Sequence, residues 1–308
     1  MGMDLSDPEI LKLFFELKQH YLDGTSDMSP FTLRSRRKLG ARIDAIIKEK
    51  IRTNFNQIKD PARPESHSFL SFMLQDTEKL TPHILDSTAI EVRMFLMAGH
   101  DTVAILLQWL FYELSRNPRV RALVAAELDE IFGPNTDPEA VREVLLSPSR
   151  DASLKRLTYT SAVIKEALRM WPPAATGRGV PRGGSFTIRL PDGQSLEVND
   201  RINILVSHAI IHRNPNVWGE TANDFIPERW LDGSEADIPA GAWRAFERGP
   251  RNCIGQELAL IEAKVILACS IRHFRFTKVG LGQFRLEDGK PVVDAKGRYE
   301  VQSEIYTV

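Results

Sequence analysis

The sequence predicts a mainly α-helical fold with a small β subdomain, and three patterns indicate it. Polar residues followed by proline recur in the first two-thirds of the chain, as at 7–8 and 81–82, and such pairs begin helices. Isoleucines recur at helical spacing over 43–51. Strand-like alternation is confined to residues 186–206, where Pro-Asp-Gly at 191–193 indicates a hairpin turn.

These signals bound each predicted element. The predicted helices cover residues 8–22, 30–55, 82–115, 118–132, 138–146, 157–170 and 253–273. The predicted strands cover residues 186–190, 195–198 and 201–206, with short strands from 274 onward and turns at 288–289 and 296–297. Prolines and polar residues predict loops at 59–68 and 208–237. The long central helix, about 82–115, would measure roughly 50 Å. No internal repeat is visible, so we expect a single domain over residues 1–308.

The composition is that of a globular protein and excludes several classes. The 308 residues include 40 basic and 41 acidic side chains, a balance that argues against a nucleic-acid partner. Two cysteines are too few for a disulfide-stabilised scaffold. The N-terminus shows no signal-peptide pattern. The most apolar stretch, 94–112, contains His100, Asp101 and Gln108, so we predict a buried helix of a soluble chain with no membrane anchor.

The two cysteines differ in their surroundings. Cys269 lies among apolar residues of the last predicted helix, as is typical of a small buried side chain. Cys253 lies in a loop rich in glycine and proline at the start of that helix. A thiolate there would face the positive end of the helix and Arg251, and both stabilise it. The glycines on either side allow sharp turns that bring backbone amides close to the sulfur, as in metal-binding thiolates.

The loop over 246–255 reads Phe246-X-X-Gly249-X-Arg251-X-Cys253-X-Gly255 and resembles the heme-ligand loop of the cytochrome P450 family at every fixed position. The resemblance implies a P450-like fold that is incomplete at the N-terminus, with heme b as the cofactor. It implies that Cys253 is the iron ligand, whose electron donation favours O–O cleavage. Phe246 would shield that ligand, Arg251 would meet a heme propionate, and Gly249 and Gly255 would shape the cofactor loop.

The segment 98–102 (Ala-Gly-His-Asp-Thr) lies midway along the long predicted helix. A glycine in a helix interior costs about 1 kcal/mol and a buried aspartate costs more, so the segment is either a packing defect or a functional groove. In the P450 family this groove lies over the heme. The resemblance implies that Gly99 leaves room for dioxygen, that Thr102 hydrogen-bonds it, and that Asp101 relays protons, while Ala98 is predicted as a wall of the pocket.

Glu166 and Arg169 lie three residues apart on a predicted helix. Such a pair on a surface is weak evidence, since it contributes only about 0.2–0.5 kcal/mol. Apolar residues at 163–164 and 168 predict a buried helix instead, and a buried pair needs a further partner. The resemblance supplies Arg229, in the segment Pro-Glu-Arg-Trp, as the third member of a structural triad that serves folding and heme incorporation.

Two further segments match the family. The segment from His212 to Trp218 resembles the loop before the triad arginine. His212 is not predicted to bind a metal, because no second His or Cys lies at ligand spacing from it. Arg178 matches the strand arginine that binds a propionate. Phe95 and Ala174 are predicted as additional walls of the substrate pocket.

The resemblance predicts a heme-thiolate monooxygenase that inserts one oxygen atom of dioxygen into a small apolar organic substrate. A flavoprotein reductase would supply electrons and dock on the cysteine side, which Arg244, Arg248 and Arg251 make positive. The same arginines equally fit propionate binding or simple solvation. The motifs are similar to those of fungal secondary-metabolism members, whose substrates include fatty acids, terpenoids and polyketides.

Two alternatives remain open on the sequence. A heme-dependent isomerase or dehydratase would need no reductase, but such branches often lose the Asp101-Thr102 pair that this chain retains. An incomplete fragment that binds heme poorly would follow from the greater N-terminal length of family members. We expect the chain on the cytoplasmic side, associated with the endoplasmic reticulum if the full-length protein carries an N-terminal anchor.

Overall fold

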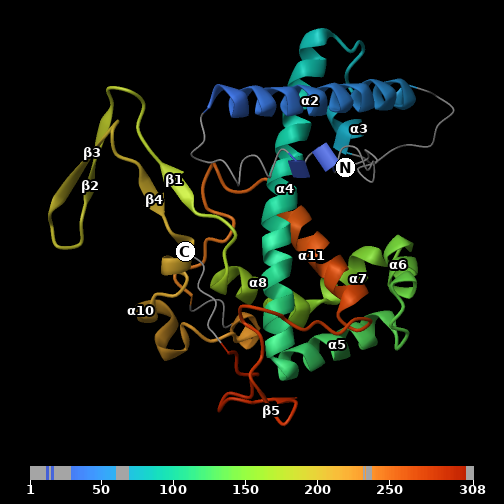
Figure 1. The fold of residues 1–308 in the computed structure, drawn as a ribbon, viewed down its shortest axis with the longest axis vertical. Helices are drawn as coiled ribbons and strands as arrows, with labels where there is room; N and C mark the ends of the chain where they lie inside the picture. Colours follow the sequence, from blue (N-terminus) through green and yellow to red (C-terminus); the bar gives the residue numbers. More distant parts are fainter. Residues whose placement is uncertain are drawn as a thin grey trace. The chain divides into compact units, whose positions relative to one another are not determined.

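The structure is a computed structural model that describes residues 12–13, 15–16, 29–59, 69–231, 233 and 238–302. The described part is mainly helical, with three two-stranded antiparallel sheets, and this confirms the predicted fold class (Figure 1). The chain divides into two compact units, residues 1–100 and 101–308. The long helix α4 (Pro82–Arg116) contributes residues to both, and each unit is described by itself.

The first unit is built around helix α2 (Pro30–Ile58). The Ser29 hydroxyl caps its start by accepting a hydrogen bond from the Thr32 amide at 3.2 Å, with Pro30 at the first helical position. The short helix α3 (Phe69–Leu74), which periodicity did not predict, packs on α2. The buried core joins α2, α3 and α4 through Ile43, Ile47, Ile51, Leu70, Leu74, Leu85, Ala89 and Val92. Most of the helix predicted at 8–22 and of the loop predicted at 59–68 lies outside the described residues.

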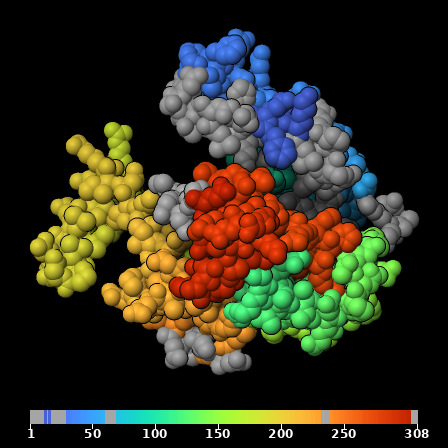
Figure 2. Space-filling view, turned by 60° about the horizontal axis from the view of Figure 1, so that its bottom comes forward, coloured from blue at the N-terminus to red at the C-terminus, as the bar shows by residue number. Residues whose placement is uncertain are grey.

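The second unit contains most of the remaining helices. These are α5 (Pro118–Phe132), α6 (Pro138–Leu146), α7 (Arg150–Arg156), α8 (Thr158–Met170) and α11 (Gln256–Ser270). Their shared core includes Leu110, Leu114, Val124, Leu128, Leu157, Ile164, Leu168, Ala263 and Leu267. The predicted helices at 118–132, 138–146 and 157–170 are therefore confirmed, whereas α7 was missed. Figure 2 shows the red C-terminal segment lying against the green segment that holds α5. Arg121 of α5 also donates to the carbonyl of Ile271, the residue that follows α11, at 3.1 Å.

Three small sheets complete this unit. Strand β1 (Thr176–Arg178) pairs with β4 (Ile204–Val206), and β2 (Ser185–Arg189) pairs with β3 (Ser195–Asn199) in the yellow hairpin of Figure 1. The strand predicted at 201–206 begins only at Ile204, because residues 200–201 form a turn. In the tail, β5 (Leu286–Glu287) and β6 (Lys290–Pro291) flank the predicted turn at 288–289. Short helical turns interrupt the predicted loop at 208–237: α9 (His208–Ile211), α10 (Pro215–Trp218), η1 (Gly219–Thr221) and η2 (Pro227–Trp230).

Helix α4 is less buried than predicted. By length and composition it could cross a bilayer, and it is the only such helix in the described part of the chain; 22% of its most apolar window is buried. The core covers it toward its two ends, whereas Met94 is 64% exposed and Met97 is 47% exposed. The apolar stretch predicted a buried helix, but described neighbours pack along only part of α4.

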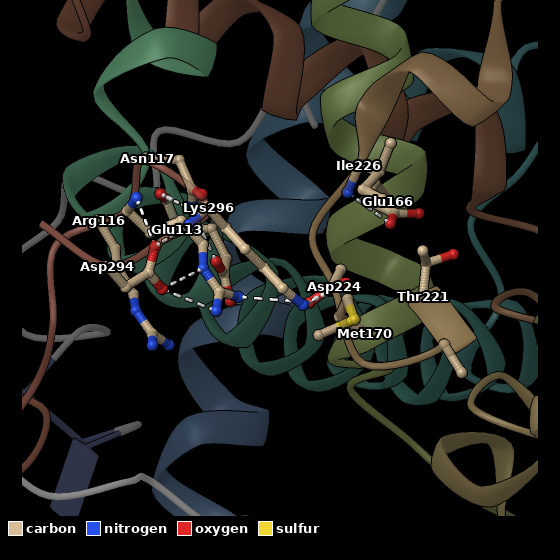
Figure 3. Close-up of polar contacts among 12 residues, drawn as sticks. Glu113, Arg116, Asn117, Glu166, Met170, Thr221, Asp224, Ile226, Asp294 and Lys296 are labelled. Carbon is tan, nitrogen blue, oxygen red and sulfur yellow. Dashed lines mark hydrogen bonds and ion pairs between the residues drawn. The ribbon is translucent and has the colours of Figure 1, made fainter. Parts of the chain in front are cut away.

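A buried carboxyl group positions the C-terminal end of α8. Trp171, the residue that follows α8, stacks on Trp109 with ring centroids 3.8 Å apart. Its indole N–H donates to the Glu113 carboxyl at 2.9 Å, and Asn117 donates to the other oxygen of that group at 3.0 Å. Figure 3 shows Glu113 beside Asn117. Burial raises the pKa of Glu113. Because water cannot reach the buried carboxyl group, Trp171 and Asn117 supply its hydrogen-bond partners instead.

The N-terminus of α8 is capped from another helix. Leu157, at the cap position, has no side chain that can accept a hydrogen bond. The Glu127 carboxylate of α5 takes this place and accepts the Tyr159 amide at 2.6 Å and the Thr160 amide at 2.8 Å. The Thr160 hydroxyl adds a bond of 2.6 Å. A negative group at this helix end also interacts favourably with the helix dipole.

Replacing Glu127 with alanine is expected to lower the free energy of unfolding by about 1–2 kcal/mol, because two amides of α8 lose their acceptor. Urea unfolding followed by helical circular dichroism measures the change. Glu130→Ala on the same helix is the matched control, since its single ion pair with Arg156 is exposed. Equal losses in the two variants would show that the cap contributes nothing specific.

Candidate functional site

The cysteine loop closes on itself through one backbone hydrogen bond. The Cys253 amide donates to the Phe246 carbonyl at 2.8 Å, and the Asn252 amide donates to the Gly249 carbonyl at 3.1 Å. Gly249 has a φ of 83°, which a residue with a Cβ rarely adopts. Helix α11 begins at Gln256 rather than at Cys253 as predicted, because Gly255 is its N-cap residue. The thiol is therefore exposed in a turn just before the start of a helix.

Two arginines were predicted to serve this site. Arg251 lies two residues before Cys253 and is exposed, and Arg178 ends strand β1, where its side chain donates to the Gly177 carbonyl at 3.0 Å. Neither guanidinium forms an ion pair with a carboxylate of the described residues. Both are therefore able to bind carboxylates of a ligand.

A heme fits the chemistry of these residues. Its iron takes a thiolate ligand and its two propionates take cationic partners; the loop offers the exposed Cys253 sulfur and the exposed Arg251, and strand β1 offers the exposed Arg178. A Cβ at position 255 would lie 3.9 Å from the Cys253 sulfur, an ordinary van der Waals contact, so the Gly255 backbone lies close beside the sulfur. No group of three His, Cys, Asp or Glu residues that could hold a metal ion occurs in the described residues.

Glu247 and its partners hold the loop and were not anticipated from the sequence. The Glu247 carboxylate accepts from the Arg244 guanidinium at 2.6 Å and lies 3.1 Å from Nε2 of His208 on α9. The bonds from Arg244, followed by those from Thr176 and His208, lower the pKa of Glu247 to about 2. Arg244, predicted to make the cysteine side positive, is thus paired with the Glu247 carboxylate. The only feature of the sequence that could have indicated this role is the acidic residue that directly follows Phe246 of the motif.

His212 lies behind the same loop and connects it to α8. Its Nε2 accepts the Arg244 amide at 2.7 Å, and its Nδ1 lies 3.2 Å from the Arg169 carbonyl. It is fully buried, and burial, with a contribution from neighbouring His208, lowers its pKa from 6.5 to about 4. The neutral imidazole is therefore a structural bridge between the Arg244 amide and the Arg169 carbonyl.

The depressed pKa of His212 predicts a loss of stability in mild acid. The unfolded state takes up a proton as the pH falls through 6.5, whereas the folded state does so only near 4. The contribution of neutral His212 to the free energy of unfolding is therefore fully present above 6.5, its pKa in the unfolded state. This contribution is lost as the pH falls toward 4, its pKa in the folded state. Between about pH 7.5 and 5.5 the free energy of unfolding should drop by about 1 kcal/mol more in the parent than in His212→Gln. Urea midpoints across this window measure the difference, and parallel curves would contradict it.

The structure brings Glu166, Arg169 and Arg229 together. Arg169 makes two hydrogen bonds of 2.9 Å to the Glu166 carboxylate, and Arg229 makes one of 3.1 Å. Glu166 and Arg169 are fully buried, as the apolar sequence around them predicts. The Glu166 carboxylate also accepts the Ile226 amide and the Trp230 indole N–H, each at 2.9 Å, and Figure 3 shows Ile226 beside it.

Arg169 uses its remaining donors on the loop that follows the strands. It donates to the carbonyls of His212 at 2.9 Å, Ala222 at 2.7 Å and Asp224 at 2.8 Å. The Asp224 carboxylate in turn binds Lys296 of the tail at 2.5 Å, as Figure 3 shows. One buried arginine thereby ties α8 to residues 212–224, and through Asp224 to the C-terminal tail.

The residues predicted on the central helix occupy the middle of α4. Ala98 and Gly99 are exposed, Asp101 and Thr102 are half-buried, and no heavy atom lies within 4 Å of a Cβ built on Gly99. The boundary between the two units falls after His100. Their catalytic roles thus remain predictions, as do the pocket roles of Ala174, which is exposed, and of Phe95, whose ring packs on Phe69 with centroids 4.3 Å apart.

A mainly α-helical fold with an exposed cysteine in a turn just before a helix is the arrangement expected of a heme-binding protein with a thiolate ligand. The chain belongs to the cytochrome P450 family, whose family model matches residues 5–302.

Curated relatives agree with this assignment. Cytochrome P450 monooxygenase polC of Polytolypa hystricis is 38% identical over 199 residues, which are 64% of this chain and 34% of that protein. Cytokinin hydroxylase of Arabidopsis thaliana is 38% identical over 187 residues, 61% of this chain and 32% of that protein. Cytochrome P450 monooxygenase acrF of Aspergillus aculeatus is 29% identical over 329 residues, 97% of this chain and 64% of that protein. The chain thus matches between about a third and two thirds of the length of these relatives.

Proposed function

We propose that the chain is the heme-binding part of a monooxygenase that inserts one oxygen atom of dioxygen into a small apolar organic substrate. The observation that supports this most directly is the cysteine loop, in which an exposed thiol precedes a helix in a turn closed by the 2.8 Å bond from Cys253 to Phe246. Relatives that match 97% and 64% of the chain are named as monooxygenases.

The residues of the chain take distinct roles in this proposal. Cys253 holds the iron of heme b, which when bound supplies the oxidising chemistry. Arg251 and Arg178 neutralise the propionates and fix the orientation of the ring. Thr102 donates a hydrogen bond in the groove over the heme, and Asp101 passes protons to it. The Glu166, Arg169 and Arg229 triad fixes the position of α8 relative to the 212–229 segment.

Electrons come from a flavoprotein reductase in this proposal. Arg248 and Arg251 are exposed and keep the cysteine face positive, whereas Arg244 is paired with Glu247. An acidic partner surface would be steered toward this face, and the effect would weaken with salt. Association with the endoplasmic reticulum belongs to the same proposal, for a full-length protein that carries an anchor.

The decisive experiment is an absorption spectrum of the purified chain after heme supplementation, reduction and addition of carbon monoxide. A strongly red-shifted Soret band is expected, because thiolate ligation changes the electronic spectrum of the heme. Turnover of apolar substrates that depends on added reductase would then separate a monooxygenase from an isomerase or dehydratase. Absence of heme uptake, or a band typical of a neutral ligand, would contradict the proposal for this chain.

A further inference from the structure

Glu247 has a backbone conformation that its residue type disfavours. Its φ of 59° lies in the left-handed region, which side chains with a Cβ rarely adopt. Two residues later the loop uses glycine for a similar turn, with a φ of 83° at Gly249. A strained residue of this kind persists only where its surroundings hold it in place.

The Glu247 side chain is held by three donors. Arg244 reaches one carboxylate oxygen with two nitrogens, at 2.6 and 3.2 Å, and the Arg248 amide donates to the same oxygen at 3.1 Å. Nε2 of His208 lies 3.1 Å from the other oxygen. The hydroxyl of Thr176 lies 3.4 Å from that same histidine nitrogen. The carboxylate is only 10% exposed, so water takes little part in these bonds.

The position of Glu247 in the chain connects this anchor to the cysteine. The φ of Glu247 sets the orientation of the peptide unit that precedes it, and this unit includes the Phe246 carbonyl. That carbonyl accepts the Cys253 amide at 2.8 Å, the bond that closes the loop. Rotation at Glu247 would therefore displace the acceptor that positions Cys253.

We infer that Glu247 is a positioning residue for the heme ligand. Bound to Arg244 and His208, its carboxylate fixes the shape of the loop that presents Cys253. The contact from His208 to Thr176 links the loop to strand β1, which ends at Arg178. One buried network thus positions the proposed iron ligand relative to a proposed propionate partner. The spectroscopic part of this inference rests on the proposed heme site.

Hydrogen exchange on the heme-free chain tests the anchor independently of the cofactor. Glu247→Gly keeps the left-handed conformation accessible but removes the carboxylate, and Glu247→Gln keeps the shape but removes the charge. In both variants, amide exchange in the peptide 246–255 should become about tenfold faster, while helices α5 and α8 keep their protection. Glu257→Gln, an exposed change in the first turn of α11, is the matched control and should leave exchange unchanged.

The reduced, carbon-monoxide-bound spectrum supplies the second readout. In heme-loaded protein, both Glu247 variants should shift part of the Soret absorption from the thiolate position to that of a neutral ligand. His208→Gln, which keeps a donor for Glu247, should retain more of the thiolate band than His208→Ala.

The two readouts separate the possible failures. If even the parent chain takes up no heme, the proposed function fails for this chain, and loop exchange alone decides the inference. Unchanged loop exchange in both Glu247 variants, or a uniform increase across the whole protein, would overturn the positioning role.

Discussion

Replacing Glu166 with glutamine is expected to lower the free energy of unfolding by about 3–5 kcal/mol, the cost of breaking a buried charged network from one side. The carboxylate accepts three hydrogen bonds from two arginines, together with bonds from the Ile226 amide and the Trp230 indole. A neutral amide leaves the positive charge of Arg169, which is fully buried, without its counter-charge. Urea unfolding followed by tryptophan fluorescence measures the loss.

Two further variants make this expectation specific. Glu262→Gln, an exposed glutamate on α11, should change stability by less than about 0.5 kcal/mol. Trp230→Phe removes a single hydrogen-bond donor to the Glu166 carboxylate and should lower the free energy of unfolding by about 1 kcal/mol. This milder variant still measures the contribution of the network if Glu166→Gln does not fold. A Glu166→Gln loss no larger than that of Glu262→Gln would show that the network does not stabilise the second unit.

Replacing Cys253 with alanine is expected to abolish the thiolate-type Soret band of the reduced carbon-monoxide complex. The chain has one other cysteine, Cys269, which lies within α11, and burial raises the pKa of its thiol. Cys269 is therefore protonated at neutral pH and a poor substitute ligand, whereas Cys253 is exposed in its turn.

Cys269→Ala is the matched control and should leave the band in place. Total bound heme, measured by its pyridine complex, separates loss of the thiolate ligand from loss of the cofactor. A thiolate band that persists in Cys253→Ala, or disappears in Cys269→Ala alone, would contradict the assignment of the iron ligand.

The sequence determined those features that short stretches of chain encode. The start of α2 follows from Ser29 and Pro30, because a cap and a fixed φ act within one helical turn. The turns at Asp288-Gly289 and in the loop over 246–255 are predicted in the same way, because glycine at 249 and 289 can adopt the positive φ that each turn requires. The spacing of the cysteine motif was sufficient to identify the P450 family, which the family model then showed.

Only the tertiary structure decided which polar side chains become buried and what they bind. The chain has 41 acidic residues, and no local pattern separates Glu113, Glu127 or Glu247 from the solvated majority. Glu127 caps a helix that begins 31 residues later, and Glu247 binds a histidine 39 residues away. Such contacts depend on how distant segments meet, and burial then makes each bond matter because water no longer competes for it. Sequence spacing therefore predicted which cysteine is the iron ligand, while long-range packing selected the carboxylates that bind the cysteine loop and the N-terminus of α8.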